Sequence, residues 1–339
     1  MIYKNIAIHN VGELIHCKDT EGVRWLRVPQ EVYEAMESDS GKRLCRGATG
    51  VELRFVMKSD TVTLRMKVNE GTGVFHIFRG SIQGGWEDHE LKQYVTDEVC
   101  DFVIKKSENM PVLRRITEEY HQPFAPEVVR VILDRGTYEL IDVIGDVEPP
   151  EKKQLPEKTL LSYGSSITHG SNSIDASHAW VSVLAHNLRV DARNLGMAGS
   201  CWMEPAIVEY IAKEGEKGKW DMATLELGIN VLDWEKDKIM NRVSNTLRQI
   251  AGRNPGKPVF VISPFYCIDD YVQGGKAEKW RRLIAEVVQT EKYANVTYIN
   301  GLDLLGDMSL ISADEVHPNI FGVAQIASRL ETVMKQKLL

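Results

Sequence analysis

Residues 162–170 read SYGSSITHG, and they place Ser165 and Ser166 between a short apolar run and the start of a helical pattern. A serine hydroxyl is a weak nucleophile unless a neighbouring base removes its proton. In a turn from a strand to a helix, Ser166 would expose its hydroxyl and leave its N–H near a helix N-terminus, where an anionic oxygen binds well. Two interpretations therefore stay open for this turn: Ser166 is a nucleophile, or Ser165 and Ser166 only cap the following helix.

A base for Ser166 is available in DEVHP, residues 314–318, where Asp314 and His317 are three residues apart. A short turn of this kind can hold an imidazole with one nitrogen toward the carboxylate and the other facing outward. The carboxylate then fixes the tautomer and stabilises the imidazolium that forms during the reaction. His169 competes as the base, but no carboxylate is placed to orient it. A loop histidine beside a helix-capping aspartate is the alternative interpretation of Asp314 and His317.

Acyl transfer also needs donors for the negative charge that develops on the carbonyl oxygen, each worth about 3 kcal/mol. Gly199 lies in NLGMAGS, where the absence of a side chain lets a backbone N–H approach a ligand. Asn230 ends LGIN, and its side-chain amide can donate. An ordinary turn at Gly199 and a helix cap at Asn230 are the alternatives. Trp202 and Trp234 follow closely and are candidates for substrate binding through their aromatic faces, unless they pack in the core or a lid.

The second half of the chain has the pattern of a parallel α/β sheet. Short apolar runs alternate there with segments whose apolar residues recur at helical spacing. Ligands of such sheets bind beyond the carboxyl ends of the strands. Three of the polar segments above follow predicted strands, and DEVHP lies in the loop before the last predicted helix. The predicted strands are 158–163, 190–195, 222–227, 258–262 and 296–299.

The first half of the chain is predicted to be all-β. Residues 51–57 and 61–68 alternate apolar and polar side chains around a candidate turn, and residues 128–134 and 138–144 flank Arg135-Gly136, so two hairpins are expected. Short strands with turn signals favour a β-sandwich of the jelly-roll kind. Residues 147–157 hold three prolines and several charges and have the composition of a linker. The predicted domains are the ranges 1–150, a β-sandwich accessory domain, and 151–339, an α/β domain. A loop at 80–90 is a further candidate to bring Trp86 to the site.

Length and composition restrict the class of protein. The 339 residues exceed the roughly 250–300 at which one hydrophobic core usually splits, which agrees with two domains. A net charge of −7 offers no electrostatic footprint for nucleic acid, and no basic cluster suggests a membrane surface. No apolar run reaches the roughly 18–20 residues that span a bilayer, and the first ten residues are too polar for a signal peptide. The five cysteines lack CxxC spacing, so structural zinc and a disulfide framework are not expected. Reduced thiols of this kind predict a cytoplasmic location.

Taken together, the four segments resemble the conserved blocks of the SGNH hydrolases, also called the GDSL esterase/lipase family. YGSSIT is similar to the Gly-Asp-Ser block, which implies Ser166 as the nucleophile. DEVHP is similar to the fifth block, which implies Asp314 and His317 as the other members of a Ser-His-Asp triad. NLGMAGS and LGIN resemble the second and third blocks, which implies an oxyanion hole. The implied oxyanion donors are Ser166, Gly199 and Asn230.

Two positions depart from the pattern of these blocks. Ser165 stands where an aspartate usually precedes the nucleophile, and Val231 stands where an aspartate often follows the third-block asparagine. Neither position performs acid–base chemistry, so we expect activity to survive and the packing near the nucleophile to differ. The resemblance also implies Gly228 as the turn glycine of the third block.

A β-sandwich followed by such a hydrolase domain resembles two-domain carbohydrate acetyl esterases. The resemblance implies a three-layer α/β/α C-terminal domain with a parallel sheet and a serine esterase acting on small acyl esters, with acetyl esters of carbohydrates preferred. It implies no metal or organic cofactor, and a small-molecule or carbohydrate ester as the substrate. A lipid or thioester acyl hydrolase and a catalytically inactive carbohydrate-binding protein are the alternatives. The natural acyl group, the alcohol and the oligomeric state are left open.

Overall fold

Five short strands form the sheet predicted from the second half of the chain. The computed structural model describes every residue except 72, 86–88 and 339. The sheet has the order β15-β14-β16-β17-β18, and the pairs β14–β16, β16–β17 and β17–β18 are parallel. The strands are β14 (Thr159–Gly164), β15 (Asp191–Gly196), β16 (Met222–Glu226), β17 (Val259–Ile262) and β18 (Val296–Ile299).

This strand order contains a switch point that predicts where a ligand binds. The chain passes from β14 to the edge strand β15 on one side and then to β16 on the other. In a sheet of order 2-1-3-4-5, the crevice outside the carboxyl ends of strands 1 and 3 is the usual ligand site. The residues that follow β14 and β16 are therefore the ones to examine for chemistry.

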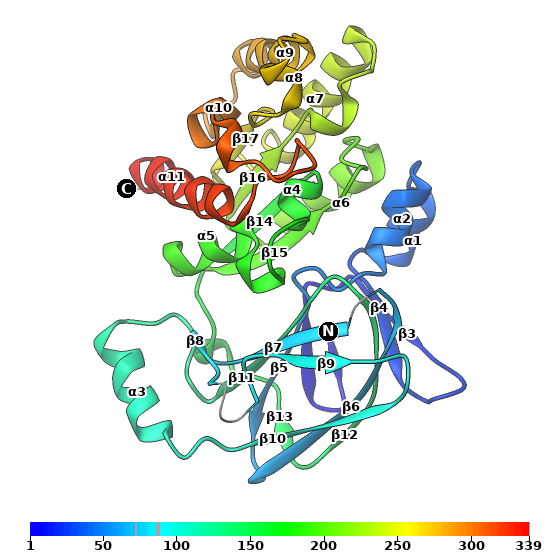
Figure 1. The fold of residues 1–339 in the computed structure, drawn as a ribbon, viewed down its shortest axis with the longest axis vertical. Helices are drawn as coiled ribbons and strands as arrows, with labels where there is room; N and C mark the ends of the chain where they lie inside the picture. The colour runs from blue at the N-terminus through cyan, green and yellow to red at the C-terminus, as the bar shows by residue number, and fades with distance from the viewer. Residues whose placement is uncertain (72, 86–88, 339) are drawn as a thin grey trace. The chain divides into compact units, whose positions relative to one another are not determined.

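Helices cover both faces of this sheet, as the three-layer prediction requires. Helices α5 and α11 pack on each other on one side, and α6, α7 and α9 pack together on the other (Figure 1). The longer helices are α5 (Trp180–Leu188), α6 (Pro205–Glu216), α7 (Lys236–Ile250), α9 (Lys276–Glu291) and α11 (Ile320–Leu338). Three single-turn helices are α4 (Ser166–His169), α8 (Ile268–Tyr271) and α10 (Gly301–Leu304). The sequence analysis did not single out α6, although Pro205 starts it and Ile207, Val208 and Ile211 bury one face.

The strands of the first half of the chain form two antiparallel sheets around a shared apolar core (Figure 1). One sheet has the order β1-β2-β5-β11-β7-β8, with β13 also paired to β5 and β9 to β7, and the other has the order β10-β6-β12-β4-β3. The first sheet consists of β1 (Ile2–Tyr3), β2 (Ile6–His9), β5 (Glu52–Met57), β7 (Gly73–Arg79), β8 (Ile82–Gln83), β9 (Gln93–Val95), β11 (Val128–Leu133) and β13 (Val147–Glu148). The second consists of β3 (Glu13–His16), β4 (Val23–Leu26), β6 (Thr61–Glu70), β10 (Cys100–Lys105) and β12 (Thr137–Ile144). Helices α1 (Gln30–Ala35), α2 (Asp39–Cys45) and α3 (Met110–Glu119) lie between strands in the sequence.

Both hairpins predicted in this half are wrong. The strands themselves form, but β5 pairs with β2, β11 and β13, whereas β6 pairs with β10 and β12 in the other sheet. The β11–β12 connection likewise passes from one sheet to the other. Leu53 of β5 and Leu64 of β6 are both fully buried in the same core. An alternating strand buries one face equally well against a partner in its own sheet or in a facing sheet, so alternation does not select between them.

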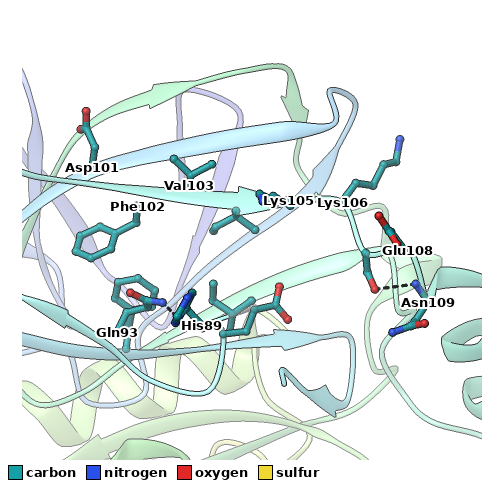
Figure 2. Close-up of a pocket in the computed structure, with 14 residues that line it drawn as sticks. His89, Gln93, Asp101, Phe102, Val103, Lys105, Lys106, Glu108 and Asn109 are labelled. Carbon is teal, nitrogen blue, oxygen red and sulfur yellow. Dashed lines mark hydrogen bonds between the residues drawn. The ribbon is translucent and has the colours of Figure 1, made fainter. Parts of the chain in front are cut away.

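A cavity of about 630 Å³ opens at one edge of this β-sandwich, lined by β7, β9, β10 and the loop that follows β10. Asp101, Phe102 and Val103 of β10 are among the lining residues, and the Phe102 side chain extends to the opposite side of the strand from those of Asp101 and Val103, as alternation requires (Figure 2). The Phe102 ring meets Phe75 edge to face, with ring centroids 4.9 Å apart. Trp86, which the sequence analysis considered for the site, lies outside the described residues.

Two compact units divide the chain, and each is built from separated segments. One consists of residues 1–33, 45–157 and 189–191, and the other of residues 34–44, 158–188 and 192–339. The division into domains 1–150 and 151–339 stays a prediction. Among the described residues, no helix combines the length and the apolar character needed to cross a membrane.

Residues 34–44 pack in the second unit through polar contacts. The buried carboxylate of Glu204 accepts hydrogen bonds from the N–H groups of Glu37 and Ser38, the second at 3.2 Å. The Ser38 hydroxyl lies 3.0 Å from that of Ser200, and Arg242 pairs with both carboxylate oxygens of Glu37 at 2.7 and 2.9 Å. A piece of the N-terminal half therefore supports the loop that follows β15.

Candidate active site

Ser166 is the first residue of α4, directly after the turn that ends β14. The Ser165 side chain caps this helix by accepting a hydrogen bond from the Ile167 N–H at 3.1 Å, so the capping interpretation holds for Ser165. Ser166 is 8% exposed. As the first residue of the helix, its N–H has no acceptor within the helix, which leaves it available to an anionic oxygen.

His317 and Asp314 meet Ser166 in the order that a catalytic triad requires. The His317 Nε2 lies 2.6 Å from the Ser166 Oγ, and the His317 Nδ1 lies 2.7 Å from the Asp314 Oδ2. These three residues, predicted from separate segments, are therefore brought together. The triad prediction depends most on a contact between Ser166 and His317, which are 151 positions apart, and this contact is present.

The Asp314 carboxylate is held in place by donors on both oxygens. Its Oδ1 accepts from the N–H groups of Val316 at 3.1 Å and His317 at 2.9 Å, and its Oδ2 accepts from Asn172 at 2.5 Å as well as facing the imidazole. Partial burial tends to raise the pKa of this carboxyl, but the backbone donors and the imidazole outweigh it and hold the pKa below its usual value. The side chain therefore stays ionised and can accept the Nδ1 proton. The sequence analysis missed Asn172, since nothing in its spacing connects it to Asp314.

His169, the competing base, lies buried in α4. The ring nitrogen within hydrogen-bond distance of the Ser166 hydroxyl is that of His317. A second Asp-His pair has the same spacing: Asp175 accepts from His178 Nδ1 at 2.9 Å, and this hydrogen bond raises the His178 pKa.

Gly199 and Asn230 follow the two strands that flank β14. The loop with Gly199 is tied to β14 by a hydrogen bond of 2.7 Å from the Met197 N–H to the Gly164 carbonyl. The Asn230 Oδ1 accepts from the Cys201 N–H at 3.1 Å, so the oxygen of this amide is engaged and its NH₂ group is the end left to donate. Both predicted oxyanion donors therefore lie in loops at the same sheet edge as Ser166, on either side of it.

The remaining third-block positions are structural. Gly228 has a φ of +112°, and a Cβ at this position would lie 2.8 Å from the Pro264 ring. Only glycine fits such a turn without strain, and this turn sets the direction of Asn230. Val231 is 1% exposed and packs in the core.

Trp202 and Trp234, the candidates for substrate binding, pack against each other with ring centroids 5.9 Å apart. Both are half-buried, and the Lys238 ammonium lies 3.6 Å from the centroid of the Trp234 ring. The pair follows the two loops that carry Gly199 and Asn230. It therefore offers aromatic surface close to those loops, although each ring already has a partner.

Glu226 is a residue that the sequence analysis missed. It ends β16, is fully buried, and its Oε2 accepts from the Ser165 N–H and hydroxyl, both at 2.7 Å. Burial raises its pKa from 4.5 to about 7, against the lowering effect of these hydrogen bonds. A carboxylate at the last position of a buried strand without other charged residues, just before LGIN, was the available signal. Elsewhere in the described part of the chain, no group of three or more His, Cys, Asp or Glu side chains is arranged to hold a metal ion.

Comparison with known families decides the relationship of the chain. Residues 157–335 match the model of the GDSL-like lipase/acylhydrolase family, which is more than half of the sequence. The chain belongs to this family. The protein is therefore a carboxylic ester hydrolase of the SGNH type. A comparison with the curated proteins finds no match.

Solved structures share the fold over almost the whole chain. A salicylyl-acyltransferase, SsfX3, from a tetracycline biosynthetic pathway is similar with a TM-score of 0.78 at 16% identity, over 99% of this chain and 95% of that one. A family two carbohydrate esterase from Cellvibrio japonicus has a TM-score of 0.66 at 13% identity, over 98% and 95%. A family two carbohydrate esterase from Clostridium thermocellum, in complex with cellohexaose, has a TM-score of 0.62 at 15% identity, over 98% and 99%. At these identities the likeness is one of fold, and it includes both the β-sandwich and the α/β layers.

Proposed function

We propose that this GDSL-family esterase hydrolyses small acyl esters, acetyl esters of carbohydrates in the first place, with Ser166, His317 and Asp314 as its catalytic triad. The observation that carries the proposal is the unbroken hydrogen-bonded row from the Ser166 Oγ through the His317 imidazole to the Asp314 carboxylate. Each contact has the length that proton transfer between these groups requires.

The proposed reaction has two half-reactions of the same form. His317 takes the proton of Ser166 as its Oγ attacks the ester carbonyl, and Asp314 stabilises the imidazolium. The N–H groups of Ser166 and Gly199 and the amide of Asn230 donate to the oxyanion. His317 then protonates the leaving alcohol, and an acyl group remains on Ser166. Water attacks this acyl-enzyme with the same assistance and releases the acid.

The carbohydrate part of the proposal is supported by aromatic surface and by fold. Trp202 and Trp234 lie in the segments that follow Gly199 and Asn230, and aromatic rings of this kind stack on sugar faces. Two of the similar solved structures are family two carbohydrate esterases, one of them bound to cellohexaose.

The proposal is tested by acetate release from acetylated xylo- and cello-oligosaccharides, alongside turnover of p-nitrophenyl acetate, by wild type and Ser166→Ala. We expect both substrates to be hydrolysed by wild type only. Equal rates for the two proteins would overturn the triad assignment. Sugar binding without turnover of any ester would favour the carbohydrate-binding alternative.

A preference for longer acyl groups is the second candidate function, and one apolar cavity favours it. The cavity measures about 90 Å³ and is lined by Ile174, Val183, Ile320 and Val323 among others. Ile320 comes three residues after His317, and both it and Ile174 are exposed. A series of p-nitrophenyl esters of rising chain length separates the two: kcat/KM falling beyond acetyl supports the small-acyl proposal, and kcat/KM rising supports the second.

A further inference from the structure

The carboxyl group of Glu226 lies beneath the turn that carries Ser166. It reaches there from the end of β16, the strand that pairs with β14. Its Oε2 accepts three hydrogen bonds: from the Ser165 N–H at 2.7 Å, the Ser165 hydroxyl at 2.7 Å and the Thr168 hydroxyl at 3.1 Å. The donors belong to the residue before Ser166 and to the residue two after it. One oxygen atom thus ties together both sides of the serine.

The Ser165 hydroxyl has a fixed direction because it takes part in two contacts. Its proton points to Glu226, and its oxygen accepts from the Ile167 N–H at 3.1 Å, which starts α4. A chain of hydrogen bonds therefore runs from the buried carboxyl through Ser165 into the first turn of the helix. Ser166 is the first residue of that helix, so its backbone position follows from the same contacts.

The absence of a side chain at Gly164 lets the Glu226 carboxyl approach this turn. A Cβ on Gly164 would clash with the Thr168 hydroxyl and would lie 2.7 Å from the Glu226 Oε2. Two titratable groups lie close to Glu226: Cys201, whose thiol donates to the Glu226 backbone carbonyl at 3.5 Å, and Tyr163, which contacts Cys201. Burial raises the pKa of both and keeps them neutral. Among the described residues, the Glu226 Oε1 has no hydrogen-bond partner, and no cation is among the groups that shift its pKa.

A carboxyl group buried in this way costs stability, because its charge loses water and gains no counter-ion. Carboxyl groups in such surroundings are concentrated at functional sites. Ser165 is also the position at which this chain departs from the Gly-Asp-Ser form of the family block. We propose that Glu226 is a positioning residue for the nucleophile: its oxygen holds Ser165 and Thr168 so that the Ser166 hydroxyl meets His317. This inference rests on the proposed role of Ser166.

The test compares Glu226→Ala, Glu226→Gln and Ser165→Ala with wild type on p-nitrophenyl acetate. Glu226→Ala removes the acceptor, and kcat is expected to fall about 100-fold with KM nearly unchanged, because misplacing a nucleophile by about 1 Å costs that much. Glu226→Gln keeps a carbonyl oxygen and is expected to restore kcat to within about tenfold of wild type. Ser165→Ala breaks the link to α4, and its loss should not add fully to that of Glu226→Ala in the double variant, since both remove the same link.

Thr224→Val is the matched control. Thr224 lies two residues earlier on the same face of β16, is fully buried, and donates to Ser162 at 2.7 Å, away from α4. We expect its kcat to match wild type even where its unfolding free energy falls by as much as that of Glu226→Gln. If kcat falls in Thr224→Val in proportion to its loss of stability, loss of stability alone would explain the effect of the Glu226 variants. Glu226 would then have a purely structural role, and the inference would be overturned.

The outcomes separate the inference from the proposed function. If Ser166→Ala is inactive while Glu226→Ala and Ser165→Ala keep wild-type kcat, Glu226 does not position the nucleophile and the triad stands. If Ser166→Ala keeps wild-type activity, the triad itself is overturned. Should Glu226→Ala fail to fold, Ser165→Ala decides alone, because it removes the same link without leaving a large cavity.

Discussion

The Asp314 carboxylate faces four donors, two backbone N–H groups on one oxygen and Asn172 with the His317 imidazole on the other. It is nonetheless 40% exposed, and His317 is 21% exposed, so burial contributes little to their pairing. Hydrogen bonds hold the pair together instead of burial. Their donors come from residues within three positions of Asp314 and from the loop that follows α4. The Asp-x-x-His spacing predicted this pairing because a single turn can satisfy it.

Asp314→Asn is expected to lower kcat by about 1,000- to 10,000-fold, because a neutral amide neither fixes the required tautomer of His317 nor stabilises the imidazolium. Steady-state turnover of p-nitrophenyl acetate measures the effect. Asn172→Ala is the control, since it removes one donor from Asp314 and leaves its charge, and it should cost far less. A kcat of Asp314→Asn within tenfold of wild type would contradict the role of Asp314.

A second prediction concerns how the free energy of unfolding depends on pH through Glu226. Its pKa is about 7 in the folded protein and 4.5 ordinarily, so the folded state binds the extra proton between these values. The contribution of Glu226 to the free energy of unfolding is therefore fully present below pH 4.5 and is lost as the pH rises toward about 7. Denaturant unfolding of wild type and Glu226→Gln at matched pH isolates the group, because other titrations are common to both. A difference between the two proteins that does not change over this range would disprove the assignment.

The elements that hold the site differ in how far the sequence determines them. The five parallel strands were predicted within one residue at each end, because four of them are mainly apolar runs followed by a glycine or a polar residue, whereas β15 (Asp191–Gly196) includes polar side chains and was placed by its position between two helical patterns. The order of β15, β14 and β16 then places the segments with Ser166, Gly199 and Asn230 at one switch point. The β-sandwich strands were also found, but their pairing was not, since alternation is the same for partners in one sheet or in two. Glu226 was missed because its burial depends on Ser165 and Thr168, which are near it in space and not in sequence.

Gly228 and Gly199 provide a matched pair for testing the two loops. Both have positive φ, but a Cβ at Gly228 would meet Pro264, whereas one at Gly199 has no atom within 4 Å. Gly228→Ala is expected to lower the free energy of unfolding by about 3 kcal/mol, from backbone strain plus a clash. Gly199→Ala should cost about 1 kcal/mol, the price of the left-handed conformation alone. Urea unfolding measures both, and equal losses would show that the contact with Pro264 is relieved elsewhere.

At the level of the whole chain, the two compact units are interleaved, which composition and periodicity did not indicate. Residues 34–44 belong with the α/β unit, where Glu37 and Ser38 donate to the buried Glu204 carboxylate and Glu37 pairs with Arg242. Burial already raises the pKa of Glu204. The packing of residues 34–44 in the α/β unit depends on contacts between segments that are distant in the sequence. No local sequence pattern predicts it.

A fragment of residues 158–339 is therefore expected to be less stable than the full chain, although it contains the whole proposed triad. The fragment loses the hydrogen bonds from Glu37 and Ser38 to Glu204 and the ion pair between Glu37 and Arg242, contacts worth about 1–3 kcal/mol together. Thermal unfolding and p-nitrophenyl acetate turnover of the fragment and the full chain measure this. A fragment as stable as the full chain would show that residues 34–44 are dispensable.

The most direct test of the central claim is to find which atom becomes acylated or phosphonylated. A fluorophosphonate probe reacts with an activated serine nucleophile, and peptide mapping by mass spectrometry locates the adduct. We predict one adduct, on Ser166, that is absent in Ser166→Ala and strongly slowed in His317→Ala, while Thr224→Val labels like wild type. An adduct on another residue, or labelling of Ser166→Ala at the wild-type rate, would contradict the account.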